Sequence, residues 1–423
     1  MDFSGLAEQI EHHELPGLAL GVCTAGSVLW SGAVGVTRAG GDRPIGTETM
    51  FSVQSCSKMY TATAVLHAVR DGLVELDTPI VRYLPEFRVR SAFEEHPERR
   101  ITLRHLLSHT AGFTHEAPVG SNYLVGRESF EAHCRSISGT WLRFPVGDRF
   151  EYSNLGIDLA GYILQRRSGS PFHQYVRRSL FAPLGLERTS FDPRVIAREA
   201  DRAIGHSKGY SRRPVRVPMV AAGGVYTSVA DACRYVQFHL TNGSQLAELY
   251  SGQGYGLGVA LPMMNGIPVR GHSGGGFGFL SDMFWEPESG FGVVVLTNST
   301  DHPLQWKLAS DIFRELVGEN SAVPTPEDPV AGSDDVPERS PAAPDGPWNR
   351  DYAIHVSGVR DGTARLRQEN GVHLIDHWGG GTYRLREHQP GFYLSSNGEM
   401  LDLTQAPPTY ANVRLHELSE RRA

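Results

Sequence analysis

A proline-rich segment near the C-terminal end constrains the fold of this 423-residue chain more than any other feature. Residues 320–347 hold seven prolines and many serines, aspartates and glutamates, but almost no large apolar side chains. Such a composition cannot bury enough apolar surface to fold by itself. We therefore expect a large domain over residues 1–319, a linker over 320–347 and a small domain over 348–423.

The large domain mixes helical and strand-like patterns. Apolar spacing of three and four residues predicts helices at 3–14, 55–71, 104–109, 155–167, 228–240 and 306–317. Apolar runs bounded by glycine and proline predict strands at 18–22, 28–34, 255–261, 283–285 and 291–297. Strands at both ends of a mostly helical middle indicate an α/β sandwich whose first and last segments share one sheet.

The C-terminal part has a different pattern. Short apolar runs alternate with polar residues from residue 352 to residue 417. Such runs separated by turns are typical of small antiparallel sheets and barrels. We therefore predict a small all-β domain that is barrel-like, similar to lipocalin barrels.

Composition excludes several classes of function. The net charge of -7 and the pI of about 6.2 lack the basic surplus of a general nucleic-acid binder. The sequence shows no run of about 18 apolar residues and no secretory signal. Its four cysteines are far apart and lack metal-binding spacing. We expect reduced thiols, no metal, no cofactor and a cytoplasmic location, although a secreted form with its signal removed would read the same.

The first chemical signal is Ser55-Cys56-Ser57-Lys58, at the start of a predicted helix. Residues three apart lie on one face of a helix, so the Lys58 amine can reach the Ser55 hydroxyl. A serine hydroxyl is a poor nucleophile until a base takes its proton. Lysine becomes such a base when burial or positive neighbours lower its pKa.

The scarcity of lysine strengthens this signal. Only three of the 40 basic residues are lysines, namely Lys58, Lys208 and Lys307. Arginine serves wherever a plain positive charge is enough, but it does not deprotonate and cannot act as a base. A lysine three residues after a serine, which occurs once in the chain, therefore points to chemistry.

Two further signals follow. Tyr152 and Asn154 precede a predicted helix, where a tyrosine could relay a proton to a leaving group and an amide could bind the substrate. His272-Ser273-Gly274-Gly275 lies in a predicted glycine-rich turn, where a backbone N–H could complete an oxyanion hole with that of Ser55. Each short pattern also has a chance copy in the C-terminal part, at 410–412 and 377–379.

The order of these three signals resembles the class C β-lactamase and DD-peptidase superfamily of penicillin-binding-protein-like serine hydrolases. Flanking segments resemble it too, at 51–53, 76–85, 103–112, 183–186, 223–228 and 255–258. The similarity spans residues 5–318 and implies an antiparallel sheet flanked by helices, with an all-helical region beside it.

The same resemblance implies roles for the site residues. Ser55 is the acylated nucleophile, and Lys58 and Tyr152 are the general base and acid. The residues implied to hold the substrate and its oxyanion are Asn154, His272, Gly274 and Gly275. Many β-lactamases carry a lysine where this chain has His272, and that lysine helps bind the substrate carboxylate. Efficient β-lactam hydrolysis is therefore not expected.

Two competing motifs fit less well. Residues 271–275 match the G-x-S-x-G elbow, which would make Ser273 the nucleophile, but an elbow needs a following helix and strands are predicted here. His105 and His109 are four residues apart, as in some zinc sites, but no glutamate follows His105.

The sequence thus predicts two-step acyl transfer through Ser55 on an ester, amide or thioester. With water as acceptor, the enzyme is an esterase, D-peptidase or β-lactamase-like hydrolase. With an amine or alcohol, it is an acyltransferase, by analogy a penicillin-binding-protein-type thioesterase that closes peptides in natural-product biosynthesis. The expected partner is a small-molecule or peptide acyl substrate, including one bound to a carrier protein, with no nucleic acid and no membrane.

Two other roles stay open. The protein could be a sensor that is acylated at Ser55 and stays acylated. Alternatively, the C-terminal domain is the binding module and the catalytic part is secondary.

Overall fold

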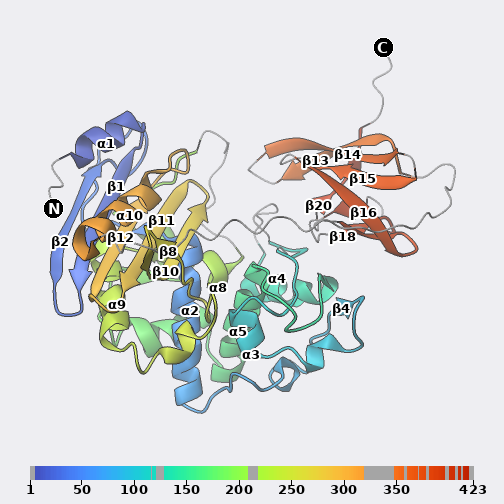
Figure 1. Ribbon diagram of the computed structural model, residues 1–423, viewed down its shortest axis with the longest axis horizontal. Coiled ribbons are helices and arrows are strands. Elements are labelled where there is room, and N and C mark those ends of the chain that lie inside the picture. The colour runs from blue at the N-terminus through green and yellow to red at the C-terminus, as the bar shows by residue number, and fades with distance from the viewer. Residues whose placement is uncertain are drawn as a thin grey trace.

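The computed structural model describes residues 5–115, 117–120, 128–207 and 218–318, and most of the region from 347 to 418 (Figure 1). Apart from Pro347, the predicted linker lies outside the described residues. The chain forms a mixed helix and sheet fold with a separate C-terminal sheet.

The first sheet joins the two ends of the large domain. Within the described residues its strand order is β10-β11-β12-β1-β2, and every neighbouring pair is antiparallel. The strands are β1 (Gly17–Thr24), β2 (Val28–Gly35), β10 (Arg270–Gly276), β11 (Phe279–Glu286) and β12 (Phe291–Thr297). Because β1 pairs with β12, the prediction that the first and last segments share one sheet is confirmed.

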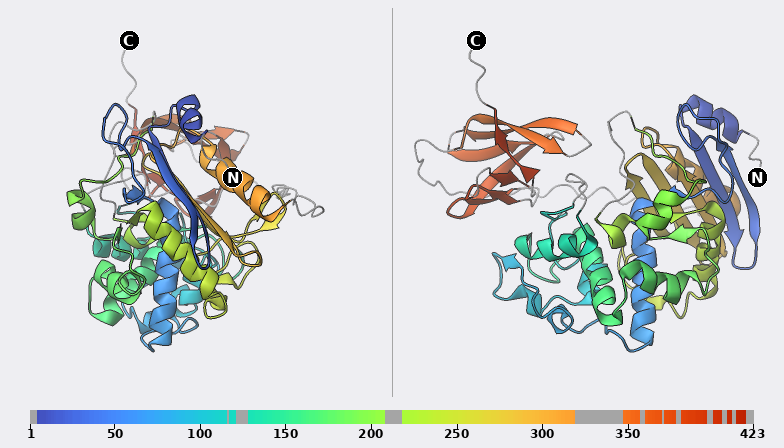
Figure 2. Two further views of the ribbon diagram at one scale, coloured as in Figure 1. Left: turned by 90° about the vertical axis from the view of Figure 1, so that its left-hand side faces the viewer. Right: turned by 180° about the vertical axis from the view of Figure 1, so that it is seen from behind.

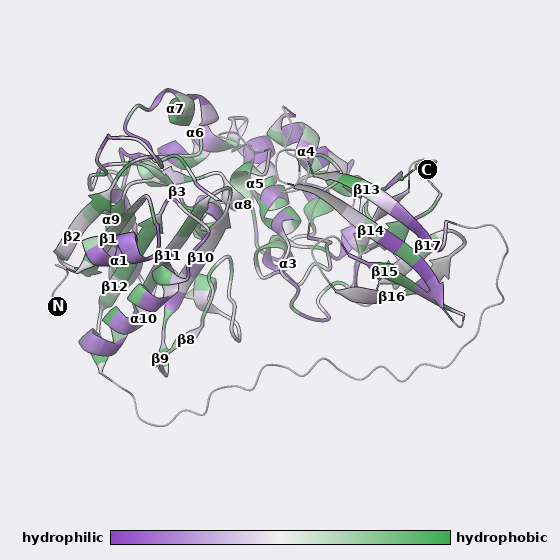
Figure 3. Cartoon of the chain, turned by 90° about the horizontal axis from the view of Figure 1, so that it is seen from above, coloured by the Kyte–Doolittle hydropathy of each residue, from purple (hydrophilic) through white to green (hydrophobic). Residues whose placement is uncertain are grey.

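Helices cover both faces of this sheet. One face packs against α1 (Leu6–His12) and α10 (Leu304–Val317), and its apolar contacts form one core. The other packs against α9 (Val229–Thr241) and α2 (Ser57–Arg70), and α5 (Asn154–Ser168) packs against α2 within the same larger core. The sheet strands are therefore largely apolar, whereas the helices alternate between apolar and polar faces (Figure 3).

A region of shorter elements completes the large domain around α2 and α5. Its helices are α3 (Leu103–Leu107), α4 (Phe130–Ser136), α6 (Phe172–Val176), α7 (Pro193–Arg198) and α8 (Val220–Gly223). Its strands are β3 (Phe51–Ser52), β4 (Arg90–Ser91), β5 (Trp141–Leu142), β6 (Thr189–Ser190) and β7 (Tyr226–Thr227). The hairpin of β8 (Met263–Met264) and β9 (Ile267–Pro268) packs instead with α10 in the core on the other face of the first sheet. None of the described helices is long and apolar enough to span a bilayer.

The C-terminal sheet is antiparallel and closes on itself. Over the described part of residues 350–417 the order is β20-β19-β18-β17-β16-β15-β14-β13-β21. The strands are β13 (Arg350–Val356), β14 (Arg360–Glu369), β15 (Val372–Asp376), β16 (Thr382–Gln389), β17 (Phe392–Ser395), β18 (Met400–Asp402), β19 (Thr409–Tyr410), β20 (Val413–Arg414) and β21 (His416–Glu417). Only Leu415 separates β20 from β21 in the chain, so one short segment pairs with both edges of the sheet.

The C-terminal sheet stands apart from the first sheet, beside the region that contains α4 (Figure 2). The contact between the two parts includes Trp141 of β5 and Phe392 of β17, whose ring centroids are 5.3 Å apart. The Arg90 guanidinium lies over the same Trp141 ring at 4.8 Å. An aromatic contact therefore joins the C-terminal sheet to the helical region.

Two local predictions are wrong. Residues 255–261 form no strand, because Gly258 has a φ of +67° and a Cβ there would lie 2.7 Å from the Ala62 Cβ. The segment is a loop pressed against α2. Conversely, residues 270–276 form strand β10 and not a turn. Gly274 permits this because a Cβ there would meet the Val53 carbonyl oxygen at 2.1 Å, so only a glycine strand can lie this close to the turn after β3.

Candidate active site

The strained turn between β3 and α2 presents Ser55. Its preceding residue, Gln54, has a left-handed φ of 47°, which is uncommon outside glycine and clusters at functional sites. Val53 holds the turn in place, since its N–H donates to the Val225 carbonyl at 3.1 Å and its own carbonyl accepts from the Ser281 hydroxyl at 2.9 Å. Ser55 is half-buried at the start of α2.

The Lys58 side chain is completely buried, with its amine beside Ser55. Nζ lies 3.1 Å from the Ser55 Oγ, 2.8 Å from the Asn154 Oδ1 and 3.0 Å from the Ala222 carbonyl oxygen. The amide and carbonyl oxygens are neutral and can only accept, so they take two N–H groups of the amine. When the amine is neutral, its lone pair therefore faces the Ser55 hydroxyl.

A buried ion pair supports the carbonyl that receives the lysine. Asp158 Oδ1 accepts the N–H groups of Ala221 at 2.9 Å and Ala222 at 3.0 Å. Its Oδ2 lies 3.1 Å from the Nε2 of His133, and the other ring nitrogen of His133 lies 2.6 Å from a backbone carbonyl. The backbone carbonyl requires a proton on Nδ1, and when the Asp158 carboxylate is ionised the second contact requires a proton on Nε2 as well, so His133 is then an imidazolium. This pair fixes α8 and, through it, the lysine.

Tyr152 is the second residue in contact with the Ser55 hydroxyl. Its hydroxyl donates to the Ser55 Oγ at 2.8 Å, and the Lys58 Nζ lies 4.8 Å from the centroid of its ring. The residue precedes α5, whose N-terminus is capped by the Ser153 hydroxyl accepting from the Leu155 N–H at 3.2 Å. The sequence order Tyr-Ser-Asn therefore places a phenol, a helix cap and the buried Asn154 amide around one nucleophile.

His109 positions the tyrosine, and the sequence interpretation missed this role. Its carbonyl oxygen accepts from the Glu151 N–H at 2.9 Å, and its Nδ1 accepts from the Ser153 N–H at 3.3 Å. Its ring centroid lies 4.5 Å from that of Tyr152. The backbone of His109 is left-handed, with a φ of 59°. His109 therefore accepts hydrogen bonds from the residues before and after Tyr152 and packs against its ring.

Strand β10 forms the remaining wall. The ring centroids of His272 and Tyr152 lie 6.2 Å apart, and His272 is buried. Gly274 lies against the turn that carries the nucleophile, and Gly275, the next residue, is exposed. The structure thus brings Ser55, Lys58, Tyr152, Asn154 and His272 together, with Gly274 and Gly275 beside them on β10.

Burial keeps the groups around this centre uncharged. The pKa of His272 is lowered to about 3, first by burial and then by the charge of Lys58. The same causes, with His272 and His115 added, hold the pKa of His109 well below its ordinary value. Burial also raises the pKa of the Cys56 thiol to about 12, so this neighbour of the nucleophile stays protonated.

The competing motifs are not supported. Ser273 lies in the middle of β10, opposite Asp282 of β11, and so it occupies no strand-to-helix elbow. His105 caps α3, where its Nδ1 accepts from the Thr102 N–H at 3.2 Å. Among the described residues, no group of three side chains is arranged to hold a metal ion. The four cysteines are buried and free.

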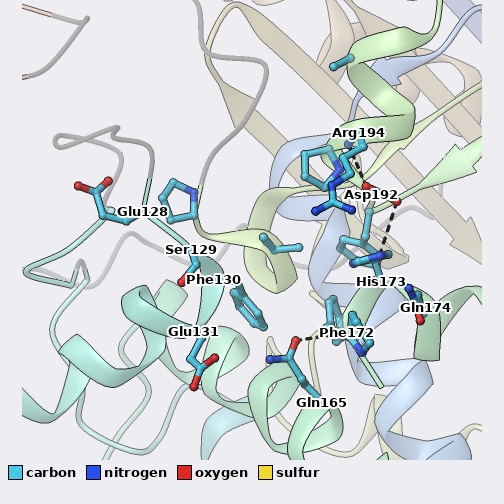
Figure 4. A pocket seen from close by; sticks show the side chains of 16 residues that line it. Glu128, Ser129, Phe130, Glu131, Gln165, Phe172, His173, Gln174, Asp192 and Arg194 are labelled. Carbon is cyan, nitrogen blue, oxygen red and sulfur yellow. Dashed lines mark hydrogen bonds and ion pairs between the residues drawn. The ribbon is translucent and has the colours of Figure 1, made fainter. Parts of the chain in front are cut away.

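A second cavity lies away from Ser55, between α4, α6 and α7 (Figure 4). It has a volume of about 580 Å³, and Phe130, Phe172 and Phe191 form much of its wall. The serine in its lining, Ser129, caps α4 by accepting from the Ala132 N–H, and no base approaches it among the lining residues. The acyl-transfer chemistry therefore belongs to the Ser55 site.

Comparison with protein families agrees with this geometry. The model of the Beta-lactamase family matches residues 4–311. Penicillin-binding protein 4 of Amycolatopsis lactamdurans is 30% identical over 356 residues, which are 76% of this chain and 90% of that protein. AmpH of Escherichia coli, a D-alanyl-D-alanine-carboxypeptidase/endopeptidase, is 26% identical over 68% of this chain and 80% of its own. Esterase EstB of Burkholderia gladioli is 29% identical over 50% of this chain and 55% of its own.

Solved structures show the same fold. A penicillin-binding protein homologue from Pyrococcus abyssi superposes with a TM-score of 0.65 at 22% identity, over 96% of this chain and 94% of its own. SurE, solved with D-Leu, gives 0.64 at 22% identity over 98% of both chains. The D-amino acid amidase of Ochrobactrum anthropi gives 0.61 at 22% identity over 74% of this chain and 96% of its own. This chain belongs to the Beta-lactamase family and is a serine acyl-transfer enzyme of the β-lactamase-like superfamily.

Proposed function

We propose that the enzyme transfers or hydrolyses acyl groups that end in a D-configured residue, through an ester bond to Ser55. The observation that carries the proposal is the Ser55 Oγ itself, which lies within 3.1 Å of the Lys58 amine and 2.8 Å of the Tyr152 hydroxyl. One oxygen thus contacts both a base and an acid, as two-step acyl transfer requires.

In the first step, the neutral Lys58 amine takes the Ser55 proton while Oγ bonds to the substrate carbonyl carbon. The carbonyl oxygen becomes an oxyanion, and we assign its stabilisation to the N–H groups of Ser55 and Gly275. The bond to the leaving group then breaks, and Tyr152 gives that group its proton. The phenolate recovers a proton from the Lys58 ammonium, 4.8 Å from its ring centroid, so the first step returns both residues to their starting states.

In the second step, water, an amine or an alcohol attacks the acyl-enzyme. The same pair removes the proton of this acceptor and returns a proton to the Ser55 Oγ as the ester bond breaks. We propose that Asn154 orients the acyl chain, because its amide is fixed by Lys58 at the floor of the site.

The D-configuration is supported by three proteins of this fold whose names refer to D-residues. They are the D-alanyl-D-alanine-carboxypeptidase AmpH, the D-amino acid amidase and SurE with D-Leu. The likeness to SurE extends over both parts of the chain. A second candidate, which the sequence raised by analogy, is a thioesterase that releases a peptide ending in a D-residue by forming an internal amide.

The test is a panel of matched N-acyl-D-alanyl and N-acyl-L-alanyl esters, amides and thioesters. The proposal predicts turnover of D-configured esters with at least about a tenfold preference in kcat/KM over the L-isomers, since a fixed site distinguishes enantiomers by 1–3 kcal/mol. Preference for L-isomers would contradict it. Adding an amine-terminated peptide separates the two candidates, because amide formation supports transfer and release of the free acid supports hydrolysis.

A burst of one equivalent of product without further turnover would instead support the sensor.

A further inference from the structure

A chain of hydrogen bonds crosses the site behind Tyr152. It begins at the Ser153 N–H, which donates to His109 Nδ1 at 3.3 Å. His109 Nε2 lies 3.1 Å from the Tyr255 hydroxyl, which lies 3.0 Å from His272 Nε2. The chain ends where His272 Nδ1 meets the Ser273 carbonyl oxygen at 2.5 Å.

The two ends fix the direction of every bond between them. A backbone N–H can only donate, so His109 Nδ1 is the acceptor and its proton is on Nε2. His109 therefore donates to Tyr255, and the Tyr255 hydroxyl donates onward to His272 Nε2. A backbone carbonyl can only accept, so the proton of His272 is on Nδ1. All four bonds form only when both histidines and the tyrosine are neutral.

We propose that Tyr255 is a positioning residue that locks His272 as the neutral Nδ1–H tautomer, so that the enzyme selects substrates whose leaving group carries no carboxylate. This inference rests on the proposed function and adds a substrate class to it. His272 faces Tyr152, the proposed donor to the leaving group, with 6.2 Å between the ring centroids. With its Nε2 bonded to Tyr255, His272 offers an incoming anion no positive charge.

The surrounding groups reinforce the lock. The titratable neighbours that act on this hydrogen-bond chain from outside it are Lys58, His115, Tyr152 and Cys56. Burial and the Lys58 charge lower the pKa of His272 to about 3. Burial keeps the Tyr255 hydroxyl protonated, because it raises the pKa of that group well above its ordinary value. A proton on either histidine would place two donors in one bond and break the chain.

The kinetic test compares two esters that give the same acyl-enzyme. One is N-acetyl-D-alanyl glycolate, with a carboxylate on its leaving group, and the other is the matching glycolamide. Wild-type enzyme should favour the glycolamide in kcat/KM, with a ratio that stays constant from about pH 5.5 to about pH 8 because the lowered pKa values keep His109 and His272 neutral. A ratio that moves toward the carboxylate below about pH 6.5 would show an ionising His272 and overturn the proposal.

Tyr255→Phe keeps the ring and removes both hydrogen bonds. It should shift the ratio toward the carboxylate ester by roughly five- to tenfold at both about pH 5.5 and about pH 8, since His272, kept neutral by burial and the Lys58 charge, can then carry its proton on Nε2 and donate it to the anion. Tyr250→Phe is the matched control. The Tyr250 hydroxyl also hydrogen-bonds to a buried histidine, at 2.8 Å from His239 Nδ1, but neither residue belongs to the hydrogen-bond chain between Ser153 and Ser273. An equal shift in the two variants, or none in Tyr255→Phe, would contradict the proposal.

A second readout does not depend on turnover. In protein with 15N-labelled histidine, long-range 1H–15N spectra should contain a signal from His272 with the pattern of an Nδ1–H tautomer. This signal should disappear in His272→Gln, and its chemical shifts should change in Tyr255→Phe. Detection of His272 as Nε2–H or as a cation near neutral pH would overturn the lock even if both esters were inert. Inert esters with the predicted tautomer would instead count against the proposed function alone.

Discussion

The two sides of the site handle protons in opposite ways. On the side of α2 and α5, neutral acceptors hold two N–H groups of the Lys58 amine, and the third direction faces Ser55. On the side of β10, the hydrogen-bond chain ending at His272 is anchored to backbone groups at both ends. Proton transfer therefore belongs to the first side, whereas the second side contributes shape and neutral contacts.

The largest expected effect comes from removing the base while keeping its charge. Lys58→Arg should lower kcat/KM for a D-alanyl ester by roughly 10⁴-fold, because a guanidinium cannot accept the Ser55 proton. Lys307→Arg is the matched control, since Lys307 is exposed and pairs with Asp311 on α10. Normal activity of Lys58→Arg would show that Lys58 is not the base, and would contradict the assignment of proton transfer to the side of α2 and α5.

Removing the acid should have the next largest effect. Tyr152→Phe deletes the hydroxyl that donates to the Ser55 Oγ, and kcat should fall by roughly 10²- to 10³-fold with little change in KM. The control is Tyr175→Phe, because the Tyr175 hydroxyl is also buried but contacts none of the residues of the Ser55 site. A loss seen mainly in KM would give Tyr152 a binding role instead.

The Asp158–His133 pair, which holds the carbonyl that accepts from Lys58, can be tested without changing the lysine. Asp158→Asn removes the charge that pairs with the buried His133, so the free energy of unfolding should fall by about 3–5 kcal/mol. Activity should fall by about tenfold in the protein that remains folded, because the Ala222 carbonyl loses its fixed position. These values come from chemical denaturation and from kcat/KM at a temperature below the transition.

Asp192→Asn provides the contrast, because its partner His173 is 3.5 Å away and both side chains are partly exposed. We expect less than about 1 kcal/mol there. Similar losses in the two variants would show that the buried pair has no special role.

The smallest effect concerns Asp282, a buried carboxylate on β11, the strand next to β10. Asp282 lies opposite Ser273 in the β10–β11 ladder, and its carboxylate is buried. Burial raises its pKa to about 7, and Ser273 opposes this rise only in part. A raised folded-state pKa means stability that is complete below the unfolded pKa of 3.8 and is lost as pH rises through 7.

Between about pH 5 and about pH 8, the free energy of unfolding of the wild-type protein should therefore fall by an amount on the order of 1–3 kcal/mol because of Asp282. Asp282→Asn should not show this fall. Thermal unfolding of both proteins across this range gives the difference. Asp148→Asn, at an exposed carboxylate, serves as control. A difference between wild type and Asp282→Asn that did not change with pH would mean that Asp282 is already ionised in the folded protein.

Local patterns predicted much of this molecule. The β1–β2 hairpin, α2, α5, α9 and the pairing of the first and last strands follow from apolar periodicity and capping residues. The contacts of Ser55, Lys58 and Tyr152 were predicted from residue type, spacing and resemblance, and the structure brings these side chains together.

The remaining features depend on contacts between distant segments. Gly274 reads as a turn residue, yet it lies in a strand because the Val53 carbonyl leaves no room for a Cβ. His109 reads as one of a histidine pair four residues apart, and its role appears only when residues 151–153 fold against it. The Asp158–His133 pair joins two helices, and no spacing rule connects them.

The most direct test of the account is to trap the acyl-enzyme. Rapid acid quench during turnover of an N-acetyl-D-alanyl ester, followed by intact mass and peptide mapping, should place one acyl group on Ser55. Ser57 is an internal control in the same peptide, because its buried hydroxyl accepts from the Val225 N–H at 3.0 Å and should stay unmodified. Product formation with the acyl group on Ser273 or another residue, or undiminished turnover in Ser55→Ala, would contradict the account.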